Sequence, residues 1–265
     1  LWSVIIASVF SVFIALIFGI WRFNKTNVNS KMIFKLNKNL LKDFFNYSYK
    51  LYISGLIGYF NNYSMRLILS LLLSPSKVAF FTLAQDRASL LNKIPDAVNL
   101  LLYPRVSNSD NQESSLKTVK AFRILLILSS FSSLLLAIFI YPLVLLMYGE
   151  AYIPMVIPFI IVLPGILING VTSVFISYFN GVGRSDLTMK LSFFPLILQL
   201  ILGIVLINYF GIIGAAISFT LAMFFFGCLK TFFFIKVSKI SFKEHIPISV
   251  DYIYIFNFFK LKILK

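Results

Sequence analysis

Arg66 is the residue of this sequence whose position most needs a chemical explanation. It lies in the apolar stretch GYFNNYSMRLILSLLLS, where an arginine facing lipid would cost about 2.5–3.5 kcal/mol. Tyr59, Asn62 and Tyr63 precede it at positions i, i+3 and i+4, with Arg66 at i+7, so the four side chains share one helix face. A guanidinium beside amide and phenol donors favours the binding of an anion.

A larger polar stripe follows in the stretch FFTLAQDRASLLNKIPDAVNLLLYP. At about 100° per residue, its main polar face covers an arc of roughly 140°, and Arg87 lies almost opposite. The arc holds Thr82, Gln85, Asp86, Ser89, Asn92, Lys93, Asp96 and Asn99. One face of this helix must therefore meet protein or water instead of lipid.

Two interpretations of these polar faces remain open. In the first, Arg66 pairs with Asp86 or Asp96, and the network only joins two helices. In the second, the faces line a hydrated path or a substrate site, which is the default for ionisable groups inside a membrane. The cations Arg66, Arg87 and Lys93 outnumber the two carboxylates by one, which suits an anionic ligand.

The second interpretation predicts a set of substrate-binding residues: Arg66, Lys93, Arg87, Asn62, Tyr59, Tyr63, Gln85 and Asn92. A separate hypothesis assigns proton or cation coupling to Asp86 and Asp96. We expect no catalytic residue, no cofactor and no metal site. Cys228 and His245 are the only cysteine and histidine, and they form no ligand cluster.

The composition indicates that membrane helices must position these side chains. Hydrophobic residues make up 59% of the chain, charged residues 12%, and the mean hydropathy is +0.91. Apolar runs long enough to cross about 30 Å of hydrocarbon predict about seven spans. These cover residues 1–21, 49–73, 79–104, 121–148, 154–180, 189–208 and 212–235. The predicted fold class is all-α, a polytopic transmembrane helix bundle.

The basic residues predict on which side of the membrane each link lies. Most of the 24 Lys and Arg fall in 22–50, 105–123, 184–190 and 230–265, the regions after alternate spans. The positive-inside rule places these regions, and with them the C-terminus, in the cytoplasm. The net charge of +15 therefore reports topology, and we expect no nucleic-acid binding.

The sequence divides into four predicted regions. Residues 1–21 form one membrane helix, 22–48 a basic cytoplasmic linker, 49–236 a six-helix transmembrane lobe, and 237–265 a basic cytoplasmic or interfacial tail. The chain opens directly in an apolar helix, without a starting Met or a cleavage site. We therefore expect a C-terminal fragment of a longer protein.

Two local patterns predict how the helices are interrupted and packed. Pro95 removes a backbone hydrogen bond and should kink the helix of residues 79–104. The stretch GIIGAAIS, residues 211–218, places small residues four apart, which predicts close helix packing.

Several strings, taken in order, resemble a known family. They are LYISGLIGYFNNYSMRLILSLLLSPSKVAFFTLAQDRASLLNKIPDAVNLLLYPRVS, LLMYGEAY, VLPGILINGV, YFNGVGRSD and NYFGIIGAAIS, within residues 40–236. Their order and spacing resemble those of bacterial polysaccharide or O-antigen flippases, which are called Wzx-like. These belong to a superfamily with the MATE multidrug exporters and the oligosaccharidyl-lipid exporters.

The resemblance implies a MATE-like fold of two six-helix lobes, represented here by the last helix of one lobe and the whole second lobe. It implies that undecaprenyl-pyrophosphate-linked oligosaccharide crosses the bacterial inner membrane by alternating access through a cationic cavity. Arg66 would then help to hold the pyrophosphate, with Arg87 and Lys93 as further candidates. The implied partners are this lipid-linked substrate, membrane lipid and other proteins of polysaccharide assembly.

Other function classes make different demands on the sequence. A MATE-type drug exporter would prefer acidic residues to a net cationic site. A membrane enzyme, such as a polymerase, would need a sizeable extracytoplasmic loop or a domain with paired carboxylates, whereas the outward links SPSKV, GEAYI and NYFG are short. A purely structural subunit would tolerate substitutions in the polar stripe. The sequence thus favours a transporter over an enzyme.

Overall fold

The computed structural model describes residues 2–25, 38–240 and 244, and these are mainly helical, with no strand among them. The chain forms two compact units, Leu1–Asp43 and Phe44–Lys265. The all-α fold class predicted from the sequence is confirmed. The predicted linker of 22–48 lies partly outside the described residues, and so does most of the predicted tail.

The first unit contains α1 (Trp2–Lys25) and the start of α2. Most of the described side chains of α1 are apolar and exposed, including Phe10, Phe13 and Trp21. A helix that is apolar on all sides is typical of a membrane span. The predicted helix of residues 1–21 therefore corresponds to α1.

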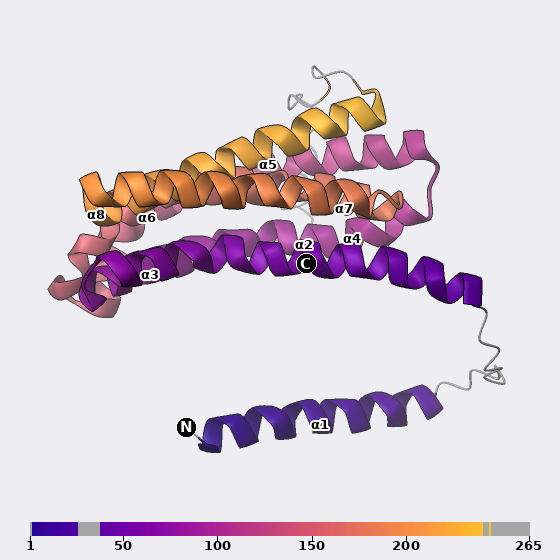
Figure 1. The fold of residues 1–265 in the computed structure, drawn as a ribbon, viewed down its shortest axis with the longest axis horizontal. Helices are drawn as coiled ribbons and strands as arrows, with labels where there is room; N and C mark the ends of the chain where they lie inside the picture. The colour runs from indigo at the N-terminus through magenta and orange to yellow at the C-terminus, as the bar shows by residue number, and fades with distance from the viewer. Residues whose placement is uncertain (1, 26–37, 241–243, 245–265) are drawn as a thin grey trace, which may run out of the picture. The chain divides into compact units, whose positions relative to one another are not determined.

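The second unit is a bundle of long helices that run in roughly similar orientations (Figure 1). Its elements are α2 (Lys38–Leu72), α3 (Pro75–Ala88), the 3₁₀ turn η1 (Ser89–Asn92), α4 (Lys93–Ser107), α5 (Asn111–Tyr148), the 3₁₀ turn η2 (Glu150–Met155), α6 (Val156–Val171), α7 (Ser173–Gly181) and α8 (Ser185–Ser238). The helix α2 begins before residue 49, so it includes part of the predicted linker as well as the predicted span.

Three helical segments of the described chain are long and apolar enough to cross a membrane: Asn111–Tyr148, Glu150–Gly181 and Ser185–Ser238. The last contains the predicted spans 189–208 and 212–235. The predicted spans 49–73 and 79–104 fall on α2 and on α3, η1 and α4, the helices that carry the polar faces. Together with the comparisons below, these helices make the chain a multi-pass membrane protein.

The helix predicted for residues 79–104 is interrupted, as Pro95 indicated. The interruption is η1, whose last residue lies three positions before the proline. Pro95 cannot donate to the carbonyl of Leu91 and its ring would clash there, which favours a tighter turn at that point. A 3₁₀ turn advances by about 120° per residue instead of 100°. The four residues of η1 therefore rotate the polar residues of α4 by about 80° relative to those of α3, compared with a continuous α-helix.

The helix α8 reverses its direction at Gly211, where φ is 57° and ψ is −131°. Its orange first half and yellow second half run in opposite directions in Figure 1. Side chains with a Cβ rarely adopt this backbone conformation, so glycine suits the turn. Beyond the turn, Gly214, Ala215 and Ser218 are buried, which confirms the close packing predicted for GIIGAAIS.

Two hydrophobic clusters hold the second unit together. One lies among α2, α3, α6 and α8 and includes Met65, Phe81 and Phe159. The other lies among α4, α5, α7 and both halves of α8, and in it the rings of Phe175 and Phe234 stack 4.4 Å apart. The first cluster supports the ends of α2 and α3 that carry Arg66 and Asp86.

Candidate functional site

Arg66 joins α2 to α3 through two side chains of the predicted polar stripe. Its Nη2 forms an ion pair with Asp86 Oδ1, and its Nε donates to Gln85 Oε1 over 3.1 Å. Gln85 in turn donates from Nε2 to the backbone oxygen of Asn62 over 3.3 Å. The sequence analysis proposed Asp86 or Asp96 as the partner of Arg66, and in the structure the partner is Asp86.

Two tyrosines complete the surroundings of Arg66. The ring centroid of Tyr63 lies 5.0 Å from Arg66 Cζ, within cation–π range, and the rings of Tyr59 and Tyr63 lie 4.4 Å apart. Both tyrosines are exposed on the second unit. We call Tyr59, Asn62, Tyr63, Arg66, Gln85 and Asp86 the Arg66 cluster.

The Arg66 cluster presents a positively charged side chain that is partly exposed. The side chain of Arg66 is 22% exposed and that of Asp86 is 47% exposed, so both can meet a ligand. A guanidinium has five N–H donors, and the bonds to Gln85 and Asp86 use two of them within the described part of the chain. The arrangement can therefore bind an anion while Asp86 holds the guanidinium in place.

The structure does not bring the remaining predicted site residues into this cluster. Arg87 points elsewhere, with Cζ 5.9 Å from the ring centroid of Tyr148 at the end of α5. Asn92 packs against α6, because a Cβ on Gly170 would lie 2.7 Å from Asn92 Oδ1. Lys93 and Asp96 are exposed at the start of α4, beyond the 3₁₀ turn.

Asn99, the last residue of the predicted stripe, connects α4 to α7. Its Nδ2 donates to Ser173 Oγ over 2.6 Å, and Ser177 Oγ donates to its Oδ1 over 2.8 Å. A buried or half-buried amide is stable inside a bundle when such bonds satisfy it. This end of the stripe therefore joins helices, as the first of the two interpretations proposed.

Lys230 is an intramembrane cation that the sequence analysis grouped with the basic C-terminal region. It lies in the second half of α8 and is 1% exposed. Its Nζ donates to the backbone oxygen of Asn169 over 3.0 Å and to Asn169 Oδ1 over 2.9 Å, and lies 4.3 Å from the ring centroid of Phe226. Its position inside the predicted span 212–235 was the signal that could have identified it, as it did for Arg66.

The contact between Lys230 and Asn169 stabilises the end of a helix. Asn169 lies in the last turn of α6, where backbone carbonyls have no partner within the helix. A cation there also interacts favourably with the helix dipole. Lys230 therefore holds α6 at the point where the chain breaks, at Thr172, before continuing as α7.

We expect Asn169→Leu to lower the free energy of unfolding by about 1.5–3 kcal/mol, because it removes a hydrogen bond to a charged group. The double variant Asn169→Leu/Lys230→Met should recover much of this loss, since no buried ammonium is left short of an acceptor. Unfolding in mixed micelles measures both. Asn208→Leu, at an exposed position on α8, is the matched control and should change little. Equal stability of Asn169→Leu and wild type would show that the bond contributes nothing.

A second buried network, also outside the predicted site, joins α2 to the first half of α8. Asn61 Nδ2 donates to the backbone oxygen of Ser192 over 3.1 Å. Gln199 Nε2 donates to the backbone oxygen of Asn61 and to Ser64 Oγ, each over 3.1 Å. Asn61 thus contacts α8 through its side chain, whereas its neighbour Asn62 contacts α3 through its backbone oxygen, which accepts from Gln85.

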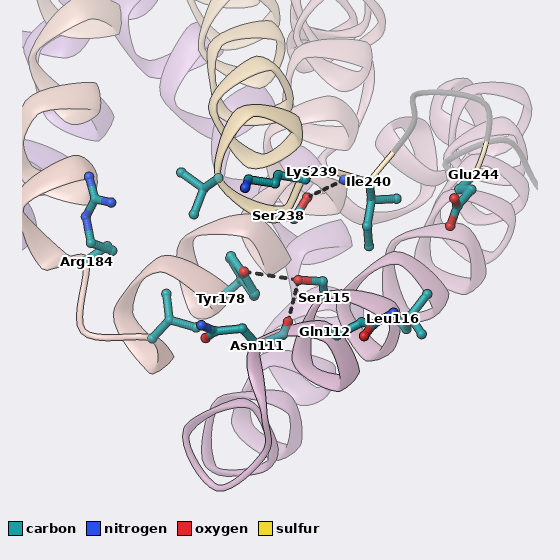
Figure 2. Close-up of a pocket in the computed structure, with 12 residues that line it drawn as sticks. Asn111, Gln112, Ser115, Leu116, Tyr178, Arg184, Ser238, Lys239, Ile240 and Glu244 are labelled. Carbon is teal, nitrogen blue, oxygen red and sulfur yellow. Dashed lines mark hydrogen bonds between the residues drawn. The ribbon is translucent and has the colours of Figure 1, made fainter.

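A cavity of about 740 Å³ lies at the other end of the bundle from the α2–α3 connection, among α5, α7 and the end of α8. Figure 2 shows Tyr178 pointing toward Ser115, with oxygens 3.1 Å apart, while Ser115 Oγ donates to the backbone oxygen of Asn111 over 2.7 Å. Arg184, Lys239 and Glu244 also line it. None of the predicted site residues lies on its wall.

Comparisons with known proteins agree with this architecture. The solved structure of a multidrug resistance MATE family transporter of the MOP superfamily, in an outward-facing conformation, matches 79% of this chain with a TM-score of 0.65 and 19% sequence identity. The match covers 49% of that transporter, so this chain spans about half its length. No curated protein matches the sequence.

A family model described as "Polysaccharide biosynthesis protein" matches residues 1–157, a range that includes the Arg66 cluster. The similarity to the MATE transporter establishes the fold, and the family model associates the chain with polysaccharide biosynthesis. Together they confirm the resemblance to polysaccharide exporters of the MATE-like superfamily that the sequence strings indicated. More than half of the chain lies within the matched range, so this protein belongs to the polysaccharide biosynthesis protein family.

Proposed function

We propose that this protein translocates an undecaprenyl-pyrophosphate-linked oligosaccharide, a repeat unit of O-antigen, capsule or exopolysaccharide, across the bacterial inner membrane by alternating access. The single observation that carries the proposal is the Arg66 cluster, a partly exposed guanidinium between two helices that the sequence predicts to span the membrane, in a chain of the polysaccharide biosynthesis family. Placing a cation inside a membrane costs free energy unless the cation pairs with a counter-charge or binds a ligand.

The chemistry of the cluster suits a pyrophosphate. Arg66 keeps N–H donors available while Asp86 and Gln85 hold its position, and a guanidinium binds phosphate oxygens in a bidentate manner. Asp86 also competes with the substrate for the guanidinium, so binding can be reversible. Because Asp86 would lose the guanidinium when substrate binds and regain it when substrate leaves, it is the better candidate for coupling to protons or cations. Asp96 lies away from the cluster.

The topology of the proposal follows the basic residues. The ends of α5, α7 and α8 near residues 105–123, 184–190 and 236–239 would face the cytoplasm, together with the C-terminus. The protein would act as a transporter without catalysing a covalent reaction. Its partners would be the lipid-linked substrate, membrane lipid and other proteins of polysaccharide assembly.

Export of drugs is the second candidate, and the fold favours it, because the matched solved structure is a multidrug resistance MATE transporter. In that case Asp86 and the paired rings of Tyr59 and Tyr63 would bind an organic cation. The basic partner of Asp86 weighs against this candidate, since Arg66 would repel the same cation.

Complementation of a bacterial strain that lacks its polysaccharide flippase tests the proposal. The strain would receive residues 1–265 alone and, in parallel, fused behind the first five helices of the first lobe of a homologous flippase, since residues 1–21 would supply the sixth. Restored surface polysaccharide in the fusion strain supports the proposal. Resistance to cationic drugs without surface polysaccharide would support the second candidate and overturn the first.

A further inference from the structure

One face of α2 carries a row of exposed, mostly aromatic side chains that leads to Arg66. Six residues form the row: Phe45, Tyr49, Tyr52, Leu56, Tyr59 and Tyr63. They are between 40% and 72% exposed on the second unit. At about 100° per residue, the six residues and Arg66 fall within an arc of roughly 100°. We call these six residues the aromatic face of α2.

The opposite side of α2 packs against the rest of the second unit. Ile57, Asn61 and Met65 lie on that side, and each is at most 5% exposed. The burial of α2 is therefore one-sided, and its aromatic face points away from the core of the second unit.

Contact with lipid alone does not explain the aromatic face. Tyr59 and Tyr63 lie near the middle of the predicted span, and their hydroxyls donate to no residue in the described part of the chain. Near the middle of α5 and of the first half of α8, exposed side chains such as Leu134 and Ile201 have no polar atom. A phenol facing hydrocarbon at that depth costs free energy, and lipid-facing tyrosines gather at the interfaces. The aromatic face therefore suits a polar partner.

The chemistry of the aromatic face suits a saccharide. A tyrosine offers a large apolar ring and a polar hydroxyl. The ring can pack on the C–H face of a sugar, while the hydroxyl exchanges hydrogen bonds with sugar hydroxyls. The six residues carry no formal charge, and the first cation along the row is Arg66. The row thus matches a neutral, polyhydroxylated ligand with an anionic group at one end.

We propose that the aromatic face of α2 binds the saccharide part of the lipid-linked substrate, with Tyr52 and Tyr59 as main contacts. The inference rests on the proposed function and extends it, because Arg66 would bind the pyrophosphate of the same molecule. Tyr52 and Arg66 are separated by roughly 21 Å along the axis of α2, at about 1.5 Å per residue. The face is therefore long enough for several sugar rings in a row. The range matched by the polysaccharide biosynthesis family, residues 1–157, contains the whole face.

The test compares the binding of two lipids to the purified full chain in detergent by native mass spectrometry. One probe is undecaprenyl pyrophosphate, and the other is the lipid-linked repeat unit extracted from a flippase-deficient strain that the fusion restores. We expect wild type to bind the glycosylated lipid more tightly. Tyr52→Ala/Tyr59→Ala should weaken the binding of the glycosylated lipid about tenfold and that of undecaprenyl pyrophosphate less than about twofold.

Two further variants serve as controls. Tyr141→Ala/Tyr209→Ala removes two exposed tyrosines from α5 and α8, and it should change the binding of either lipid less than about twofold. Tyr52→Phe/Tyr59→Phe keeps the rings and removes only the hydroxyls, so it should retain more of the binding of the glycosylated lipid than the alanine variant does. Melting temperatures close to that of wild type would show that the variants are folded.

The results distinguish this inference from the proposed function. If Tyr52→Ala/Tyr59→Ala weakens the binding of both lipids equally, or of neither, the inference is overturned while the pyrophosphate site at Arg66 stands. If Arg66→Ala leaves the binding of both lipids unchanged, the pyrophosphate site is overturned, and the tyrosine variants still decide the saccharide site. Displacement of the glycosylated lipid by tetraphenylphosphonium would assign the aromatic face to organic cations and would overturn the inference.

Discussion

Replacing Arg66 with alanine is expected to reduce surface polysaccharide to about a tenth of the wild-type level or less in the complementation strain. A hydrogen bond to a charged group contributes about 1.5–3 kcal/mol, and each 1.4 kcal/mol is a factor of ten. Arg66→Lys should retain much of the activity, because it keeps the positive charge although it loses the bidentate geometry. Full activity in both variants would exclude Arg66 from the site.

A double variant separates binding from helix joining at Arg66. Arg66→Ala alone leaves the carboxylate of Asp86 without its ion pair, so lost activity could reflect a distorted hairpin. Arg66→Ala/Asp86→Asn removes that charge as well. If the ion pair only joins α2 and α3, the double variant should recover activity. If Arg66 binds the substrate, the double variant should remain inactive while its melting temperature returns toward that of wild type.

Gly214→Ala is expected to lower the free energy of unfolding by about 3 kcal/mol, at the upper end of the usual overpacking range. A methyl group at Gly214 would lie 1.9 Å from the carbonyl oxygen of Leu206, a backbone atom that cannot rotate away. The two halves of α8 would have to separate at the Gly211 turn. Thermal unfolding in detergent measures the loss as a fall of several degrees in the melting temperature.

Gly58→Ala is the matched control for this substitution. Gly58 lies within α2, and a Cβ there would meet no atom within 4 Å. Because alanine is the better helix former by about 1 kcal/mol, this variant should be as stable as wild type or slightly more stable. If Gly214→Ala lowers the free energy of unfolding no more than Gly58→Ala does, the stability of α8 does not depend on the close approach of its two halves.

The sequence alone was sufficient for the properties that depend on local pattern. Apolar runs predicted helices where the structure has them, Pro95 predicted the interruption that became η1, and GIIGAAIS predicted a buried, closely packed segment. The spacing of Tyr59, Asn62, Tyr63 and Arg66 placed them on one face. Each of these follows from backbone hydrogen bonding, periodicity or side-chain size within a few residues.

Only the tertiary structure decided which polar residues meet. A helical projection treats residues 79–104 as one cylinder, whereas the 3₁₀ turn rotates Asn99 onto α7 and leaves Asp86 with Arg66. The partner of Lys230, Asn169, lies on another helix, so only the structure identifies this contact. Contacts between helices depend on rotation and packing of the whole bundle, and no single stretch of sequence contains that information.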